Sequence, residues 1–170
     1  MGRIGRRVAE LAAVFPMNIL FYDPYPPDAE FMARLNARLV SVDELLSSSD
    51  FVSLHLPLSD STRNMLDANT LARMKPTSYL INTARGGLVD EQALAAALQE
   101  GRIAGAAFDA FAEEPSLHSP LLVLENFIGI PHAGSSTEQT TLRMGMMASQ
   151  NALAVLRGER PEYVVNPEVY

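Results

Sequence analysis

Three side chains that could bind a carboxylate or move a proton each follow a separate apolar run of the chain. Arg85 lies in SYLINTARGGLVD, Glu114 in FDAFAEEP and His132 in GIPHAGSS. A guanidinium binds a carboxylate through two parallel hydrogen bonds, although an arginine in a loop is more commonly a plain surface residue. A histidine beside a carboxylate forms an acid–base pair, because the carboxylate selects the imidazole tautomer. If the three loops converge, they form a site that binds a carboxylate and transfers a proton.

A second group of residues, near the start of the chain, has the spacing of a dinucleotide-binding motif. In MGRIGRR, Gly2 and Gly5 match the second and third glycines of GxGxxG, although an ordinary helix N-terminus has the same appearance. Asp23 ends the run NILFYD, close to the spacing of about 20 residues expected for the acid that binds a ribose 2′-hydroxyl. It can also begin a turn with the prolines after it. Because an aspartate repels a 2′-phosphate, the motif predicts NAD rather than NADP.

The elements that must position these residues alternate between short β-branched or aromatic runs and longer segments of helical period. This alternation predicts an α/β fold, a Rossmann-type doubly wound parallel sheet, with ligands bound beyond the carboxyl ends of the strands. Several strands are apolar at consecutive positions, which predicts that both of their faces are covered. The predicted strands are residues 18–22, 38–40, 51–54, 79–82, 104–108 and 127–130. The predicted helices are residues 4–14, 29–35, 42–46, 69–74, 91–100 and 137–156.

Helix ends carry capping patterns. Ser41 with Glu44 and Ser135 with Glu138 have capping-box spacing. Gly101 stands where a left-handed residue would end a helix.

Composition excludes several classes of function. The 170 residues carry 13 basic and 20 acidic side chains, a net charge of -7, so binding to nucleic acid is not expected. The chain has no cysteine and only 3 histidines, without HExxH spacing, so neither a disulfide nor a metal site is expected. No apolar run approaches the roughly 18 to 20 residues of a membrane span. We expect a cytoplasmic protein that binds no membrane.

Five segments together carry a resemblance to a known family. INTARGGLVD, FDAFAEEP and PHAGSST, with HLPLSDSTRNMLD and the opening GRIGRR, resemble the NAD-binding domain of the D-isomer-specific 2-hydroxyacid dehydrogenases, which include phosphoglycerate dehydrogenases. The resemblance covers essentially the whole chain. It implies that Arg85 binds the substrate carboxylate, that His132 donates and accepts the proton, and that Glu114 pairs with His132. The implied reaction interconverts a 2-oxo acid and a D-2-hydroxy acid by hydride transfer with NAD.

The resemblance also implies which residues contact NAD. Gly2, Arg3 and Ile4 would meet the pyrophosphate, and Asp23 the adenosine ribose. The further residues expected to contact the cofactor are His55, Pro57, Thr62, Thr83, Ala84, Arg85, Asp109, His132 and Gly134.

Compared with that family, the sequence is expected to lack the first strand of the fold and the separate substrate-binding domain. The absent strand is central in the order 3-2-1-4-5-6, so a gap is expected between the strands ending at Asp23 and Leu54. We expect residues 1–160 to form the NAD-binding domain and residues 161–170 to begin a return segment. The chain is then a fragment that is inactive when isolated.

A homodimer is expected as well, because the gap exposes strand edges that another chain could cover. We expect its contacts to include the residues before Ala29 and residues 116–124. The alternative interpretation is a non-catalytic, NAD-responsive interaction module of the corepressor type.

Overall fold

The computed structural model describes residues 1–169, and its chain divides into two compact units, Met1–His132 and Ala133–Tyr170. The predicted domain boundary at residue 160 stays a prediction.

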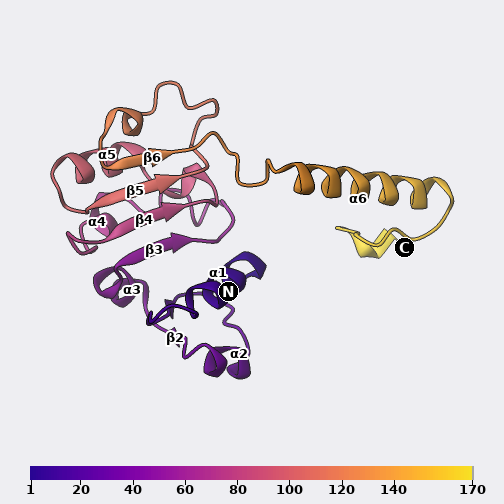
Figure 1. The fold of residues 1–170 in the computed structure, drawn as a ribbon, viewed down its shortest axis with the longest axis horizontal. Coiled ribbons are helices and arrows are strands. Elements are labelled where there is room, and N and C mark those ends of the chain that lie inside the picture. Colours follow the sequence, from indigo (N-terminus) through magenta and orange to yellow (C-terminus); the bar gives the residue numbers. More distant parts are fainter. Residues whose placement is uncertain (170) are drawn as a thin grey trace. The chain divides into compact units, whose positions relative to one another are not determined.

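The first unit contains the alternating elements that the sequence predicts (Figure 1). Its strands are β1 (Leu20–Phe21), β2 (Arg38–Leu39), β3 (Phe51–Leu54), β4 (Tyr79–Asn82), β5 (Gly105–Phe108) and β6 (Phe127–Gly129). Its α-helices are α1 (Arg3–Ala12), α2 (Ala29–Arg34), α3 (Val42–Ser48), α4 (Ala68–Leu71) and α5 (Glu91–Gln99). Two short 3-10 helices, η1 (Gly86–Leu88) and η2 (Pro120–Val123), lie in its loops. The second unit holds α6 (Glu138–Leu156) and η3 (Pro167–Val169).

All strand pairs of the first unit are parallel, and they form two sheets. β1 pairs with β2, while β3, β4, β5 and β6 form a four-stranded sheet in that order, drawn side by side in Figure 1. Leu54 lies opposite Asn82, which lies opposite Phe108, so the carboxyl ends of β3, β4 and β5 are level. β1 and β3 belong to different sheets. The α/β prediction is confirmed.

The core of the four-stranded sheet is built from aliphatic side chains and a cluster of three phenylalanines. The Phe108 ring lies 5.4 Å from that of Phe127 and 6.1 Å from that of Phe111, centroid to centroid. The prediction that strands are covered on both faces is wrong for β3. Its residues alternate between exposed and buried, and Phe51, 56% exposed, stacks on Tyr79 of β4. An alternating strand has one face on the core and one toward solvent, even when the outward residues are apolar.

The observed helix caps agree with the predicted ones at some helix ends and differ from them at others. Gly101 has the expected positive φ of 65° after α5, and the Ser41 hydroxyl accepts a hydrogen bond from the N–H of Glu44. The prediction for Ser135 is wrong. Thr137 caps α6, accepting from the N–H of Thr140 at 3.2 Å, because the helix begins two residues later than that pattern indicates.

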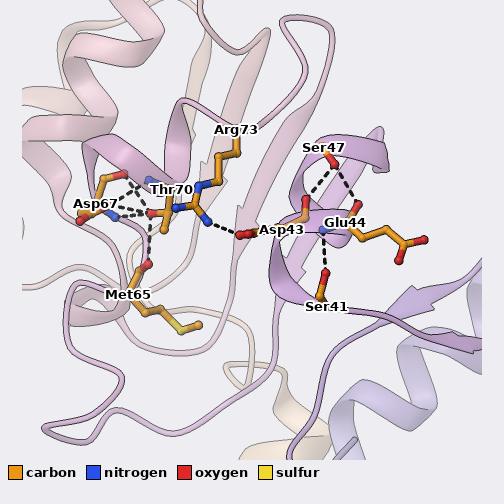
Figure 2. A network of polar contacts seen from close by, with 8 residues as sticks. All are labelled: Ser41, Asp43, Glu44, Ser47, Met65, Asp67, Thr70 and Arg73. Carbon is orange, nitrogen blue, oxygen red and sulfur yellow. Dashed lines mark hydrogen bonds and ion pairs between the residues drawn. The ribbon is translucent and has the colours of Figure 1, made fainter.

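A full capping box stands at the start of α4, where the sequence analysis missed it (Figure 2). Oδ1 of Asp67 accepts from the N–H of Thr70 at 2.8 Å, and the Thr70 hydroxyl accepts from the N–H of Asp67 at 2.7 Å. Figure 2 also shows the ion pair between Arg73 and Asp43, which joins the turn after α4 to α3. The box satisfies two backbone donors that the helix itself leaves unpaired.

We expect Asp67→Ala to lower the thermal midpoint of the chain at neutral pH by removing this box. The backbone N–H of Thr70, helped by its hydroxyl, lowers the pKa of Asp67 from the ordinary 3.8. The stabilisation is therefore complete above about pH 3.8 and is lost as the pH falls through the lower folded-state pKa. Thermal melts across that range should show the two proteins converging in acid.

Asp43→Ala is the matched control, because it removes an aspartate whose side chain forms an exposed ion pair with Arg73. Such pairs contribute little, so its melting curve should stay close to that of the unsubstituted chain. Equal melting of the Asp67→Ala variant and the parent at neutral pH would contradict the role given to the capping box.

Candidate active site

The segments that follow β3, β4, β5 and β6 carry most of the residues singled out by the sequence. Because the strands are parallel, their carboxyl ends lie at one edge of the sheet. Arg85 follows β4, Glu114 follows β5 and His132 follows β6. The three residues therefore follow three neighbouring strands at the same edge of the sheet.

Glu114 and His132 form the acid–base pair that the sequence predicts. Nδ1 of His132 lies 2.8 Å from Oε2 of Glu114, and Oε1 of Glu114 accepts from the N–H of Phe111 at 3.0 Å. The hydrogen bond from His132, then that from Phe111 and the charge of Arg85, lower the pKa of Glu114. An ionised carboxylate at Nδ1 holds the proton there, so Nε2 is the ring nitrogen able to exchange a proton with a ligand.

The backbone of His132 has a positive φ of 51°, which is uncommon for a residue other than glycine. Its N–H donates to the carbonyl of Ile130 at 3.0 Å, which helps to hold this conformation directly after β6. The side chains of His132 and Glu114 remain 49% and 39% exposed, so a ligand can reach the pair. Backbone conformations of this kind are often found at functional sites.

Arg85 is held through its backbone by a residue that the sequence analysis did not single out. The fully buried Asn82 donates through Nδ2 to the carbonyl of Arg85 at 2.9 Å and accepts from the N–H of Ala84 at 3.1 Å. The guanidinium of Arg85 donates to the carbonyl of Ala84 at 2.7 Å, and the side chain is exposed. The sequence signal that could have identified Asn82 is its position as the polar last residue of an otherwise apolar strand. Asn82 shapes the loop and leaves the guanidinium accessible.

Gly86 brings the Arg85 loop against the Glu114 loop. A Cβ at this position would lie 1.8 Å from the carbonyl carbon of Phe111 and 2.1 Å from the nitrogen of Ala112. Only a residue without a side chain allows this backbone contact. The close approach therefore places the residue after Arg85 directly against the segment that leads to Glu114.

The predicted pyrophosphate end begins with an uncapped helix. Gly2 precedes α1 with extended backbone, and no side chain caps the helix. Arg3 and Ile4 lie exposed in its first turn. A Cβ on Gly5 would lie 3.5 Å from Cβ of His55, so α1 passes close to the end of β3. Backbone N–H groups at such a helix start suit a phosphate.

Asp23 lies beside this helix start. Its Oδ1 accepts from the N–H of Tyr25 at 2.7 Å, and its Oδ2 pairs with the amino group of Met1. Partial burial acts to raise the pKa of Asp23, but the hydrogen bonds from the amino group and from Tyr25 outweigh it and lower the pKa. The carboxylate is therefore ionised next to the glycine motif, as binding to a ribose hydroxyl requires.

The loop after β3 is organised by its own polar groups. Nε2 of His55 lies 2.9 Å from the hydroxyl of Ser53, and burial lowers the pKa of His55, so the imidazole is neutral near pH 7. The hydroxyl of Thr62 donates to the carbonyl of Pro57 at 2.9 Å and accepts from the N–H of Ser59 at 2.8 Å. These contacts hold the shape of the loop, and none of them indicates that His55 transfers a proton.

The remaining predicted cofactor residues lie in different surroundings. Thr83 is exposed and Ala84 half-buried, just beyond β4. Asp109 is 6% exposed, and its N–H donates to the carbonyl of Asn82 at 2.9 Å. Gly134 belongs to the second unit. Their contacts with a nicotinamide stay predictions.

Comparison with known proteins decides the family. Residues 1–134 match the model of the D-isomer specific 2-hydroxyacid dehydrogenase, NAD binding domain. The chain belongs to this family. The resemblance drawn from the sequence motifs is confirmed, and so is NAD as the cofactor.

Relatives of this dehydrogenase domain differ in the reactions that their names give. The chain is 47% identical over 170 residues to a glyoxylate reductase from Korarchaeum cryptofilum, covering 99% of this chain and 51% of that protein. It is 46% identical over 167 residues to a D-3-phosphoglycerate dehydrogenase from Methanocaldococcus jannaschii, covering 98% of this chain and 32% of that protein. The chain thus spans about half, or less, of the length of these curated relatives.

A solved structure agrees with the fold. D-lactate dehydrogenase with NAD+ from Lactobacillus jensenii superposes with a TM-score of 0.88 at 32% identity, covering 97% of this chain and 53% of that one. The comparisons lend no support to the corepressor alternative. Among residues 1–169, no helix combines the length and the apolar character needed to cross a bilayer.

Proposed function

We propose that this dehydrogenase domain takes part in the NAD-dependent interconversion of 2-oxo acids and D-2-hydroxy acids. The observation that carries the proposal is the pairing of His132 with Glu114 beside the loop of Arg85, at the carboxyl edge of the sheet. The names of the relatives support the same reaction class.

In the proposed reaction, NADH supplies the hydride that reduces the substrate carbonyl. Arg85 binds the substrate carboxylate through its guanidinium and so orients the neighbouring carbonyl. His132 donates the proton on Nε2 to the carbonyl oxygen, while Glu114 keeps the opposite nitrogen protonated. In the reverse direction His132 accepts the proton from the hydroxyl group.

The cofactor would be held by the start of α1, with Gly2, Arg3 and Ile4 at the pyrophosphate and Asp23 at the adenosine ribose. The test of function is the loss of NADH absorbance when glyoxylate or pyruvate is added to the protein that carries this chain. Activity with pyruvate, and none with acetaldehyde, which lacks the carboxylate, supports both the reaction and the binding of the carboxylate by Arg85. No NADH oxidation with any 2-oxo acid would refute the proposal.

We further propose that the protein is a cytoplasmic homodimer that binds neither nucleic acid nor membrane. The net charge of -7 opposes binding to a phosphate backbone. The separate sheets of β1 and β3 leave strand edges that a second polypeptide segment could pair with.

We expect NADH to bind at least about tenfold more tightly than NADPH, because the ionised Asp23 repels a 2′-phosphate. Asp23→Ala should narrow this ratio toward equality, as measured by fluorescence titration of the two cofactors. Glu30→Ala, which removes the same charge from an exposed position on α2, should leave the ratio unchanged. Equal affinities in the unsubstituted chain would remove Asp23 from the ribose site.

A further inference from the structure

Glu91, the first residue of α5, makes two hydrogen bonds to the loop that carries Glu114. Its Oε1 accepts from the N–H of Ala112 at 2.7 Å, and its Oε2 accepts from the hydroxyl of Ser119 at 2.6 Å. Ala112 precedes Glu114 and Ser119 follows it. One carboxylate from a different element therefore binds the loop on both sides of Glu114.

The helix itself does not require this carboxylate. Asp90 is the N-cap of α5, and its Oδ1 accepts from the N–H groups of Gln92 and Ala93 at 3.0 and 3.1 Å. The side chain of Glu91 therefore does not cap the helix, although an acid at a helix start often does. It is half-buried against the loop instead.

Several other hydrogen bonds of the loop are local. Leu117 donates to the carbonyl of Pro115 at 2.9 Å, and Ser119 donates through its N–H to the carbonyl of Ser116 at 3.3 Å. Local bonds shape a loop but do not place it relative to the sheet. Hydrogen bonds to a charged acceptor on a packed helix do place it, and they are stronger than neutral ones.

We propose that Glu91 is a positioning residue for the Glu114–His132 pair. It holds the backbone on either side of Glu114, so that the Glu114 carboxylate meets both Nδ1 of His132 and the N–H of Phe111. The catalytic consequence rests on the function proposed above, whereas the positioning of Glu114 can be measured without it.

Substitutions at Glu91 separate hydrogen bonding from charge. Glu91→Gln keeps an oxygen to accept from Ala112, and its amide N–H can donate to the Ser119 hydroxyl, which accepts as well as donates. Glu91→Ala loses both bonds. If Glu91 acted on Glu114 only through its negative charge, both variants would lower the pKa of Glu114 equally, since a like charge would be removed.

The experiment is a pH titration of the Glu114 side-chain carboxyl by carbon NMR, on the 170-residue chain and its variants. The charged groups facing Glu114 are His132 and Arg85, and the hydrogen bond from His132 is the main cause of its lowered pKa. Glu91→Ala should move this pKa upward toward the ordinary 4.5, because the loop no longer holds Glu114 against its donors. Glu91→Gln should keep most of the lowered value, and Gln92→Ala, on the same helix turn, should keep all of it.

An unchanged Glu114 titration in folded Glu91→Ala, or a downward shift shared by both Glu91 variants, would overturn the proposal. If Glu91→Ala does not fold, Ser119→Ala removes one of the two bonds and should give a smaller upward shift, and no shift there would also overturn it. NADH titration of the same samples keeps the two hypotheses apart. If the unsubstituted chain does not bind NADH, the dehydrogenase function is contradicted. The pKa values measured for Glu114 in the variants still decide whether Glu91 positions it.

Discussion

Replacing His132 with alanine should lower turnover of a 2-oxo acid with NADH by roughly 10² to 10⁴-fold, the usual effect of removing a general acid. NADH affinity should change little, because proton transfer from Nε2 occurs after the cofactor is bound. Steady-state kinetics and NADH titration of the protein that carries this chain separate the two effects. A fall in kcat with an unchanged NADH dissociation constant is the expected pattern.

His118→Ala is the matched control for this substitution. His118 is exposed in the same loop as Glu114, and it is not a partner in the hydrogen bond between Glu114 and His132, so kcat should stay near that of the parent. Near-normal turnover after loss of His132 would mean that another group supplies the proton. A comparable loss in both variants would show that turnover is lowered by changes in either loop and that His132 has no special role.

We expect Gly86→Ala to destabilise the first unit by about 3 kcal/mol or more, because the new methyl group would collide with backbone atoms. Its Cβ would lie 1.8 Å from the carbonyl carbon of Phe111, so one of the two loops must move. The movement would also separate Arg85 from the Glu114 loop. Denaturant unfolding measures the loss of stability.

Gly87→Ala provides the comparison one residue away. There a Cβ would meet the tip of the Leu58 side chain at 3.0 Å, and a flexible leucine can turn aside. The cost should be about 1 kcal/mol, so a similar loss for both substitutions would contradict the backbone contact as the cause. A stable Gly86→Ala variant with unaltered unfolding would contradict it directly.

Much of the fold follows from local pattern. Apolar runs bounded by turn residues place β3 and β4 at the bounds that the structure has, because a strand of this length is specified by its own residues and their breakers. The glycine spacing and Asp23 indicate NAD, because a dinucleotide site reuses one short strand–turn–helix unit. The five segments together indicate the family.

Other features depend on groups distant in the chain. The motif INTARGGLVD contains Asn82 and is followed directly by Glu91. It does not show that Asn82 holds the Arg85 loop or that Glu91 binds residues 112 and 119. The sequence also does not predict the exposed stack of Phe51 on Tyr79. An apolar run has the same composition whether one or both faces of the strand are covered.

By itself, then, the sequence determined the order of the elements, the cofactor and the residue types able to do the chemistry, all of which depend on spacing along the chain. Only the tertiary structure decided which of those residues meet. The 2.8 Å contact of His132 with Glu114 requires two loops, 18 residues apart, to be brought together by the parallel sheet and by backbone packing at Gly86. Such contacts arise from strand register and close packing, which no single segment of the chain specifies alone.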